Sequence, residues 1–267
     1  MPAAVHVSTH PLIQHKLARL RAADTRPPEF RDLVSALSRG LFFEATLDVK
    51  LRPVTVHTPL TETTCYEIGE KVGLVPVLRA ADTKPPEFRD LVGALARGLF
   101  FEATLDVKLR PVVVRTPMAE TTCYEVGEKV GLVPVLRAGL GMAEAMLQSL
   151  PEASVWHLGL YRDHATLKPV TYYNKLPPKP DMDLALVLDP MLATGGSAIA
   201  AIDILKKAGT PKVKFAGIIA APEGISALQS AHPDVPVFLA ALDSHLNDVG
   251  YIVPGLGDAG DRQFGTS

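Results

Sequence analysis

A turn with two adjacent glycines is the segment of this sequence best suited to holding an anion. It lies within Leu184–Ala200, which reads LALVLDPMLATGGSAIA. The apolar run before Asp189 predicts a buried parallel strand, and apolar residues recur at helical spacing from Ser197 onward. Two lysines and then Gly209 predict where that helix ends. Thr194–Ser197 would therefore open a helix, where free backbone N–H groups and the helix dipole favour a phosphate.

Two glycine motifs of known chemistry are excluded here. The turn is not a P-loop, because its glycines are not followed directly by Lys-Ser or Lys-Thr, whose lysine would reach a β- or γ-phosphate. Gly255, Gly257 and Gly260 spell the dinucleotide-binding pattern GxGxxG. Only seven residues follow Gly260, too few for the strand–helix–strand unit that this pattern requires.

Elements that could position the turn alternate along the second half of the chain. Strands are expected at residues 131–136, 154–160, 184–188, 213–220 and 236–242, and helices near 140–149, 197–208 and 223–231. This alternation predicts an α/β fold with a mostly parallel sheet flanked by helices.

The residues that follow these strands stand at the edge where parallel sheets bind ligands, and most of them are polar. They are Arg137, Tyr161–Arg162, Asp189, Ala221–Glu223 and Asp243. Arginines at this edge would grip phosphate oxygens, and carboxylates would accept hydrogen bonds from sugar hydroxyls. Polar residues also follow strands simply because strands end at the surface, so the interpretation depends on the whole set.

Composition favours a globular protein that acts on small molecules. The chain has 267 residues, of which 47% are hydrophobic and 21% charged, with a net charge of −2 and no basic block. These values indicate neither a nucleic-acid partner nor a membrane partner, and no apolar run reaches the roughly 18 residues of a membrane helix. The start of the chain lacks the pattern of a signal peptide. Two cysteines, Cys65 and Cys123, predict no disulfide and favour a cytoplasmic location.

A tandem repeat divides the first half of the chain. Residues 22–79 recur as residues 80–137, with eight differences over the 58 positions. Repeat architectures usually have shorter and more numerous units, so this pattern indicates one in-frame duplication inside a single domain of residues 1–267, or an error in sequence assembly. Each copy predicts an amphipathic helix, which includes Phe30 in the first and Phe88 in the second.

The second helix creates a packing problem if the core has one place for its apolar face. The spare copy would then pack on a second subunit, extend as an arm or remain loosely packed. The copies also end differently, because Arg137 leads into a glycine turn, whereas Arg79 leads into the next copy. We therefore expect the second copy to enter the sheet, and we interpret Arg79 as a repeat of Arg137 that has no function.

At the level of motifs, the chain resembles the type I phosphoribosyltransferases, and among them the uracil phosphoribosyltransferases. The resemblance rests on VLDPMLATGGSAIAAIDILKKAG, with Pro190 in place of a second acidic residue, and on GYIVPGLGDAGDRQFGT near the end of the chain. Weaker matches include HPLIQHKLARLR, FFEATLD, VPVLRAGLGM, LYRDHATLKPV and AAPEGISAL. When one copy of the repeat is left out, the resemblance covers essentially the whole chain. The resemblance implies a phosphoribosyltransferase-like fold with a β arm and a C-terminal hood.

The resemblance also implies a reaction and a set of site residues. Uracil and 5-phospho-α-D-ribose 1-diphosphate would give UMP and diphosphate in pyrimidine salvage, with Mg²⁺ held mainly by the substrate and no metal site from the protein alone. Arg137 and Arg162 would hold the diphosphate, helped by backbone N–H groups near Ala138 and Gly139. The phosphoribosyl group would contact Asp189, Pro190, Met191, Leu192, Ala193, Thr194, Gly195, Gly196, Ser197 and Asp258. The uracil site would comprise Ile252, Gly257, Asp258 and Ala259.

Catalysis by this residue set would involve Asp258, Asp189 and Arg137. Arginine would stabilise the leaving diphosphate, and carboxylates the positive charge that develops on the sugar. Asp258 is the candidate base for the uracil N1 proton, although an aspartate in a turn can equally serve as a cap. The residues around Tyr172, Tyr173 and Lys175 could form a mobile hairpin over the site, or simply pack.

The resemblance further implies a homodimer or higher homo-oligomer, and some family members respond to GTP. Two other hypotheses remain open from the sequence. One is a regulatory nucleotide-binding protein on the same fold, and the other is a relative that the duplication has inactivated.

Overall fold

The computed structural model describes residues 7–47, 49, 51–68, 78–162 and 169–266, and divides the chain into two compact units. Unit 1 comprises residues 1–49 and 101–128, and unit 2 comprises residues 50–100 and 129–267. The boundary therefore cuts through both copies of the repeat. The prediction of one domain over residues 1–267 stays a prediction.

Unit 2 is built around a mostly parallel sheet. Its strands run in the order β10-β11-β9-β5-β7-β8, and β12 pairs with β11 while β6 pairs with β5. Of these neighbours, only β7 and β8 are antiparallel among the described residues. The bounds are β5 (Val130–Leu136), β6 (Ser154–Val155), β7 (Leu158–Arg162), β8 (Pro169–Asn174), β9 (Leu184–Leu188), β10 (Met191–Leu192), β11 (Lys212–Ala220) and β12 (Val237–Leu242).

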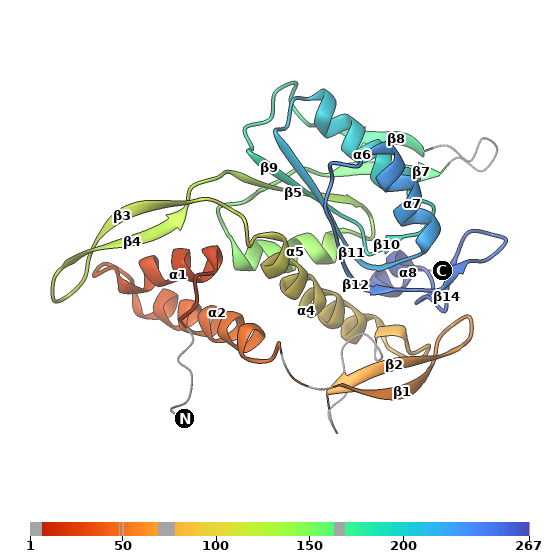
Figure 1. Cartoon of the computed structure of the whole chain (residues 1–267), viewed down its shortest axis with the longest axis horizontal. Coiled ribbons are helices and arrows are strands. Elements are labelled where there is room, and N and C mark those ends of the chain that lie inside the picture. The colour runs from red at the N-terminus through yellow and green to blue at the C-terminus, as the bar shows by residue number, and fades with distance from the viewer. Residues whose placement is uncertain (1–6, 48, 50, 69–77, 163–168, 267) are drawn as a thin grey trace. The chain divides into compact units, whose positions relative to one another are not determined.

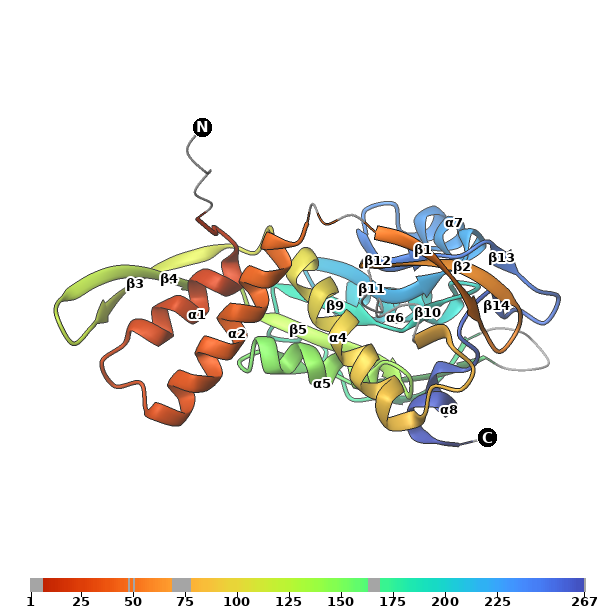
Figure 2. The ribbon, with the colours of Figure 1, turned by 90° about the horizontal axis from the view of Figure 1, so that it is seen from below.

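Helices cover both faces of this sheet, so the predicted α/β class is confirmed. Figures 1 and 2 show α6 and α7 on one face and α4 and α5 on the other. Their bounds are α4 (Pro85–Ala103), α5 (Leu140–Ser149), α6 (Gly196–Lys207) and α7 (Pro222–Ala231). Unit 2 also contains the hairpins β1 (Leu51–His57) with β2 (Glu62–Ile68) and β13 (His245–Leu246) with β14 (Ile252–Val253), and the short helix α8 (Ala259–Phe264).

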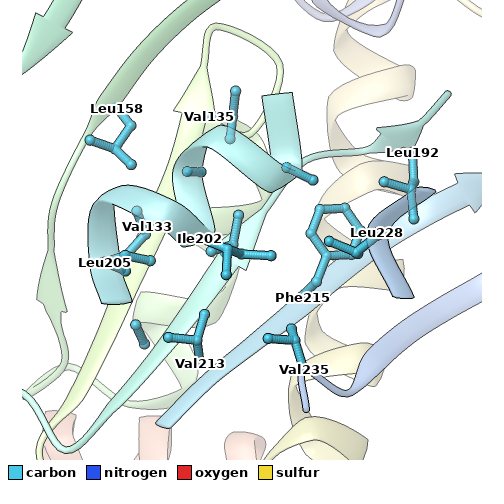
Figure 3. Packing of buried hydrophobic residues seen from close by; sticks show 14 of the residues in the cluster. Val133, Val135, Leu158, Leu192, Ile202, Leu205, Val213, Phe215, Leu228 and Val235 are labelled. Atoms are coloured by element: carbon cyan, nitrogen blue, oxygen red, sulfur yellow. The ribbon is translucent and has the colours of Figure 1, made fainter. Parts of the chain in front are cut away.

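The central core forms where α6 packs on the sheet. All five residues of β9 are buried, as the unbroken apolar run predicts, and the buried face of α6 carries Ala198, Ala201, Ile202 and Leu205. Figure 3 shows Ile202 among side chains from β5 and β11. Burying a side chain such as that of Ile202 or Leu205 stabilises the fold by about 1.5–3 kcal/mol, and thereby fixes the start of α6 against the end of β9.

Four of the five predicted strands match β5, β9, β11 and β12 within one residue. The fifth, predicted at 154–160, is two short strands instead. β6 pairs with the start of β5 and β7 with its end, and the amide of Trp156 donates to Leu132 O (2.9 Å) between them. The indole Nε1 of Trp156, which lies between the two strands, donates to Ser154 Oγ (3.0 Å).

Unit 1 holds α1 (Pro11–Arg21), α2 (Pro27–Ala45) and the hairpin of β3 (Leu109–Arg115) with β4 (Glu120–Val126). Helix α1 packs against both α2 and this hairpin, with Ala18, Val114 and Cys123 buried between them. Cys123 is a buried free thiol, and the side chain of Cys65 lies outside the described residues.

The two copies of the repeat form the same elements in different surroundings. On α4, Phe88, Val92 and Phe100 are fully buried. Their counterparts on α2, which are Phe30, Val34 and Phe42, are 45%, 42% and 64% exposed. The spare helix thus packs beside α1 with part of its apolar face uncovered.

A pair of backbone hydrogen bonds shows how the copies exchange partners. In unit 2, Ala81 N of the second copy donates to His57 O of the first copy (3.1 Å). In unit 1, the equivalent Ala23 N of the first copy donates to Arg115 O of the second (2.7 Å). Each unit therefore combines the helix start of one copy with the hairpin of the other.

Candidate active site

The carboxyl ends of β5 and β9 bring two predicted site residues to one edge of the sheet. Arg137 follows β5 and Asp189 follows β9, and the two strands are parallel neighbours, with Pro134 opposite Leu188. A Cβ atom on Gly139 would lie 2.3 Å from Leu188 O, so only glycine lets the loop after β5 approach the end of β9 this closely.

The glycine turn opens α6 as the sequence predicts. Gly195 is the N-cap residue with φ +80°, and Ile199 N makes the first hydrogen bond within the helix, to Gly195 O (2.9 Å). The amides of residues 196–198 precede that bond and face outward from the helix end. At the other end, Gly209 has φ +82° and donates to Lys206 O (3.0 Å), which confirms the predicted stop.

A second glycine brings the start of α7 against the turn. A Cβ atom on Gly224 would lie 2.3 Å from Ala193 O and 2.6 Å from Leu192 O. Within the turn, Met191–Leu192 forms β10, which pairs in parallel with the end of β11. The backbone from residue 190 to 197 is thus held on both sides, as a rigid phosphate site requires.

Asp189 carries the strongest electrostatic perturbation at this edge. It is partly buried, and desolvation raises the pKa of its carboxyl group to about 7. A backbone hydrogen bond from Met191 N (3.4 Å) opposes that rise, while the negative charge of Asp258 adds to it. Asp189 and Asp258 are therefore close enough to interact, although 69 positions separate them in the sequence.

The C-terminal segment approaches the same edge through α8. Asp258 is the N-cap of α8 and accepts from Asp261 N (2.9 Å). Gln263, which is fully buried, donates from Nε2 to Ala138 O (2.8 Å) and so ties α8 to the loop after β5. Sequence reasoning missed Gln263, because a single glutamine in a short helix carries no pattern.

Arg137 contacts this C-terminal segment. Its guanidinium donates to Asp261 Oδ1 (3.1 Å) and to Thr266 Oγ1 (3.3 Å), and its side chain is 55% exposed. The hydrogen bond from Thr266, together with Arg137, lowers the pKa of the Asp261 carboxyl. Arg137 is thus at the predicted edge with a cation accessible to a ligand.

The residues predicted to bind uracil, Asp258 among them, lie within one continuous segment, residues 252–259. Ile252 and Ala259 are buried, and Gly257 has φ +77° with Pro59 packed against it. Between them, residues Pro254–Asp258 form a loop that we call the base loop. Gly257 is half-buried, whereas Gly255 is buried and its N–H donates to Asp243 Oδ2 (2.9 Å).

Several sequence predictions need correction at this edge. The Asp243 side chain is only 1% exposed and is paired with Arg79, while Glu223 accepts from Leu246 N (3.0 Å). Both carboxylates are therefore used to hold the fold. The amide of Gly139 is also occupied, because it donates to Val135 O (2.9 Å) instead of facing a ligand.

Other predictions fall on the hairpin of β7 and β8. Arg162 ends β7, but its side chain lies outside the part of the chain that the structure describes, as do residues 163–168 at the tip. Tyr172 and Tyr173 lie on β8, 55% and 38% exposed. An antiparallel hairpin is therefore confirmed, and its mobility stays a prediction.

Arg79 is the residue that the sequence interpretation misjudged most. The interpretation of Arg79 as a repeat of Arg137 without a role is wrong, because its side chain is 6% exposed and forms an ion pair with Asp243. The available signal was the tripeptide Leu-Arg-Ala, which occurs at residues 20–22, 78–80 and 136–138. The junction between the two copies, residues 78–82, has the same sequence, LRAAD, as residues 20–24 at the end of the first helix. In the structure, Leu78 and Arg79 are helical as well.

Comparisons with known proteins agree with this geometry. A family model described as uracil phosphoribosyltransferase matches the chain over residues 7–82 and again over residues 77–266. A uracil phosphoribosyltransferase of Roseiflexus castenholzii is 64% identical over 190 residues, which are 71% of this chain and 91% of that protein. One from Macrococcus caseolyticus is 43% identical over 264 residues, or 99% of both chains.

Among solved structures, the AQ2163 protein of Aquifex aeolicus is similar with a TM-score of 0.69 and 39% identity. The match covers 73% of this chain and 93% of that one. The chain belongs to the uracil phosphoribosyltransferase family.

Proposed function

We propose that this protein transfers the phosphoribosyl group of 5-phospho-α-D-ribose 1-diphosphate to uracil, giving UMP and diphosphate. One observation carries the proposal: Gln263 Nε2 donates to Ala138 O (2.8 Å) and Arg137 pairs with Asp261 (3.1 Å), which holds the segment after the base loop at the sheet edge where Asp189 leads into α6. An anion site and a base site would thus meet at one sheet edge, as transfer between a sugar phosphate and a base requires.

The phosphoribosyl group would bind along residues 189–197. The amides of Thr194–Ser197 would hold the 5′-phosphate, and Asp189 would accept hydrogen bonds from the ribose hydroxyls. Arg137, with Arg162, would bind the diphosphate and stabilise its charge as the bond to C1′ breaks. Asp189 and Asp258 would face the positive charge that develops on the sugar.

Uracil would bind against the base loop. Its edge presents a donor between two acceptors, which fixed backbone groups can read, whereas cytosine would leave buried groups unpaired. Asp258 is the proposed acceptor of the N1 proton. The pKa of about 7 makes Asp189 a second candidate, because a base works best when its pKa lies near the working pH.

Mg²⁺ fits this site as an ion that the substrate carries. Asp189 and Asp258 are two carboxylates beside the turn, and among the described residues no group of three or more His, Cys, Asp or Glu could hold a metal. When bound, Mg²⁺ would neutralise diphosphate oxygens, and it usually keeps few protein ligands in such sites.

The direct test is product formation by the purified protein. With labelled uracil, 5-phospho-α-D-ribose 1-diphosphate and Mg²⁺, we expect labelled UMP. Binding of UMP without turnover would instead favour a regulatory nucleotide-binding protein. If folded full-length protein makes no UMP but a variant lacking residues 22–79 does, the duplication has inactivated the enzyme.

Three further properties stay predictions. They are a homo-oligomeric state, activation by GTP and a cytoplasmic location. The structure adds one related finding: within the described part of the chain, no helix is both long and apolar enough to cross a membrane. Light scattering on the purified protein tests the first, where a dimer would have about twice the chain mass of 28.6 kDa.

A further inference from the structure

The base loop has little internal structure to fix its shape. Gly255 and Gly257 both have positive φ, and glycine pays the largest conformational entropy on ordering. A Cβ atom on Gly255 would lie 2.1 Å from Ile252 O, so the close turn itself demands glycine. The position of the loop must therefore come from contacts with its surroundings.

Three hydrogen bonds from other parts of unit 2 anchor consecutive residues of the loop. Thr58 Oγ1 donates to Pro254 O (2.8 Å), Gly255 N donates to Asp243 Oδ2 (2.9 Å), and Arg262 Nη1 donates to Leu256 O (2.8 Å). The first two are buried bonds. Each therefore acts where no water can replace a lost partner.

The anchor at Gly255 depends on Arg79. Asp243 uses one oxygen for Gly255 N and the other for the Arg79 guanidinium, and both side chains are almost fully buried. Removing the cation would leave a buried carboxylate uncompensated, and the carboxylate would have to move or take up a proton. Either change weakens its hold on Gly255.

Arg79 also lies in a stretch that is bonded to the loop a second time. Arg262 donates to Leu78 O (2.9 Å) and to Ala80 O, while it donates to Leu256 O from the same guanidinium. The junction between the two copies and the base loop are thus joined through two arginines.

Both Thr58 and Arg79 belong to the first copy of the repeat. Their counterparts in the second copy have other surroundings. Thr116 Oγ1 donates to Ala119 O (2.8 Å) in a turn like that of Thr58. The Thr58 Oγ1 atom lies 2.7 Å from Thr61 O, so its one hydroxyl proton is shared between Thr61 O and Pro254 O. The bonds of Thr116 lie at the surface of unit 1. Arg137 is at the sheet edge already described.

We propose that Thr58 and Arg79 are positioning residues for the base loop, so that the first copy of the duplication sets the affinity of the site for uracil. The proposal deepens the proposed function and rests on it, because the loop matters to catalysis only if it binds the base. It also assigns a role to a segment that would otherwise be an addition to a complete enzyme.

Kinetics of matched variants test the proposal. Arg79→Met should raise the KM for uracil by about 10- to 100-fold, since small misplacements of a site cost about this much, while Arg79→Lys restores part of the loss. Thr58→Val should raise it several-fold. Thr116→Val is the matched control and should change nothing. The KM for 5-phospho-α-D-ribose 1-diphosphate should stay within about twofold throughout.

Hydrogen exchange on the full-length variants gives a readout that needs no turnover. The amide of Gly255 should exchange faster in Arg79→Met and in Thr58→Val than in the parent protein. If Arg79→Met does not fold, Thr58→Val against Thr116→Val still decides the question, because valine matches threonine in shape.

The outcomes separate the inference from the function. If the parent protein makes UMP but the uracil KM and the Gly255 exchange rate are unchanged in Thr58→Val and Arg79→Lys or Met, the inference is wrong and the function stands. Equal effects of Thr58→Val and Thr116→Val also overturn it. If the parent makes no UMP, the proposed function fails, and faster exchange at Gly255 still supports the anchoring.

Discussion

Replacing Asp189 by asparagine should stabilise the protein at neutral and alkaline pH while abolishing catalysis. In the folded state, burial and the charge of Asp258 raise the pKa of Asp189 to about 7, from an ordinary value of 3.8. Between about pH 4 and pH 7 the unfolded chain has lost this proton and the folded chain has kept it. The free energy of unfolding therefore falls as pH rises from about 4 to 7, and stays low above that.

The size of the effect follows from the shift. A shift of about three pKa units corresponds to about 4 kcal/mol, as an upper value for a group that is only partly buried. The side-chain amide of the Asp189→Asn variant would be neutral at every pH and would avoid this loss. The advantage of Asp189→Asn over the parent should thus already be about 1.6 kcal/mol at pH 5, which is about 1.2 pH units above the ordinary pKa of 3.8, and should grow up to pH 8 by several degrees in Tm.

Thermal unfolding at pH 5, 6, 7 and 8 measures this difference. Asp258→Asn, which keeps a residue able to cap α8, should shift the pH dependence to lower pH because it removes the neighbouring charge. Exposed Asp248 provides the control, and Asp248→Asn should leave the dependence unchanged. A Tm difference between parent and Asp189→Asn that is constant from pH 5 to 8 would refute the reasoning.

The remaining predictions concern the close approach at the sheet edge, the duplicated helix and the exposed cation. Gly139→Ala places a Cβ atom 2.3 Å from Leu188 O and should cost about 1–3 kcal/mol of unfolding free energy and most of the activity. Gly93→Ala, whose Cβ finds ordinary contacts, should instead stabilise α4 by about 0.5–1 kcal/mol. Urea unfolding and UMP assays check both variants. Phe88→Ala should lower the free energy of unfolding by about 3–5 kcal/mol, measured by the fluorescence of the single tryptophan, which lies in unit 2. Its counterpart Phe30→Ala should lower it far less, and equal losses would contradict the assignment of α4 to the core. Arg137→Ala should lower kcat/KM for 5-phospho-α-D-ribose 1-diphosphate by about 100-fold or more with little change in Tm, and an unchanged kcat/KM would remove Arg137 from the site.

Local signals were enough to predict the central part of the fold. The run from Leu184 to Leu188 is short and wholly apolar, the glycines after it can begin a helix, and Gly209 can end one, so the strand and the helix follow from neighbouring residues. The placement of Arg137 and Asp189 at one edge of the sheet followed from a rule of parallel sheets.

Long-range packing was beyond reach of such signals. The helices of Phe30 and Phe88 have nearly the same sequence, and only the tertiary contacts of the second decide that it is the buried one. Asp243 looked like a site residue because it ends a strand, but its pairing with Arg79 joins residues 164 positions apart. Neither outcome has a local cause.

A crystal structure of the protein with UMP tests the central claim most directly. The account predicts the phosphate within hydrogen-bond distance of the amides of Thr194–Ser197, with the uracil ring against the base loop and the ribose hydroxyls at Asp189. A phosphate bound anywhere else, or a uracil ring away from residues 252–259, would contradict it.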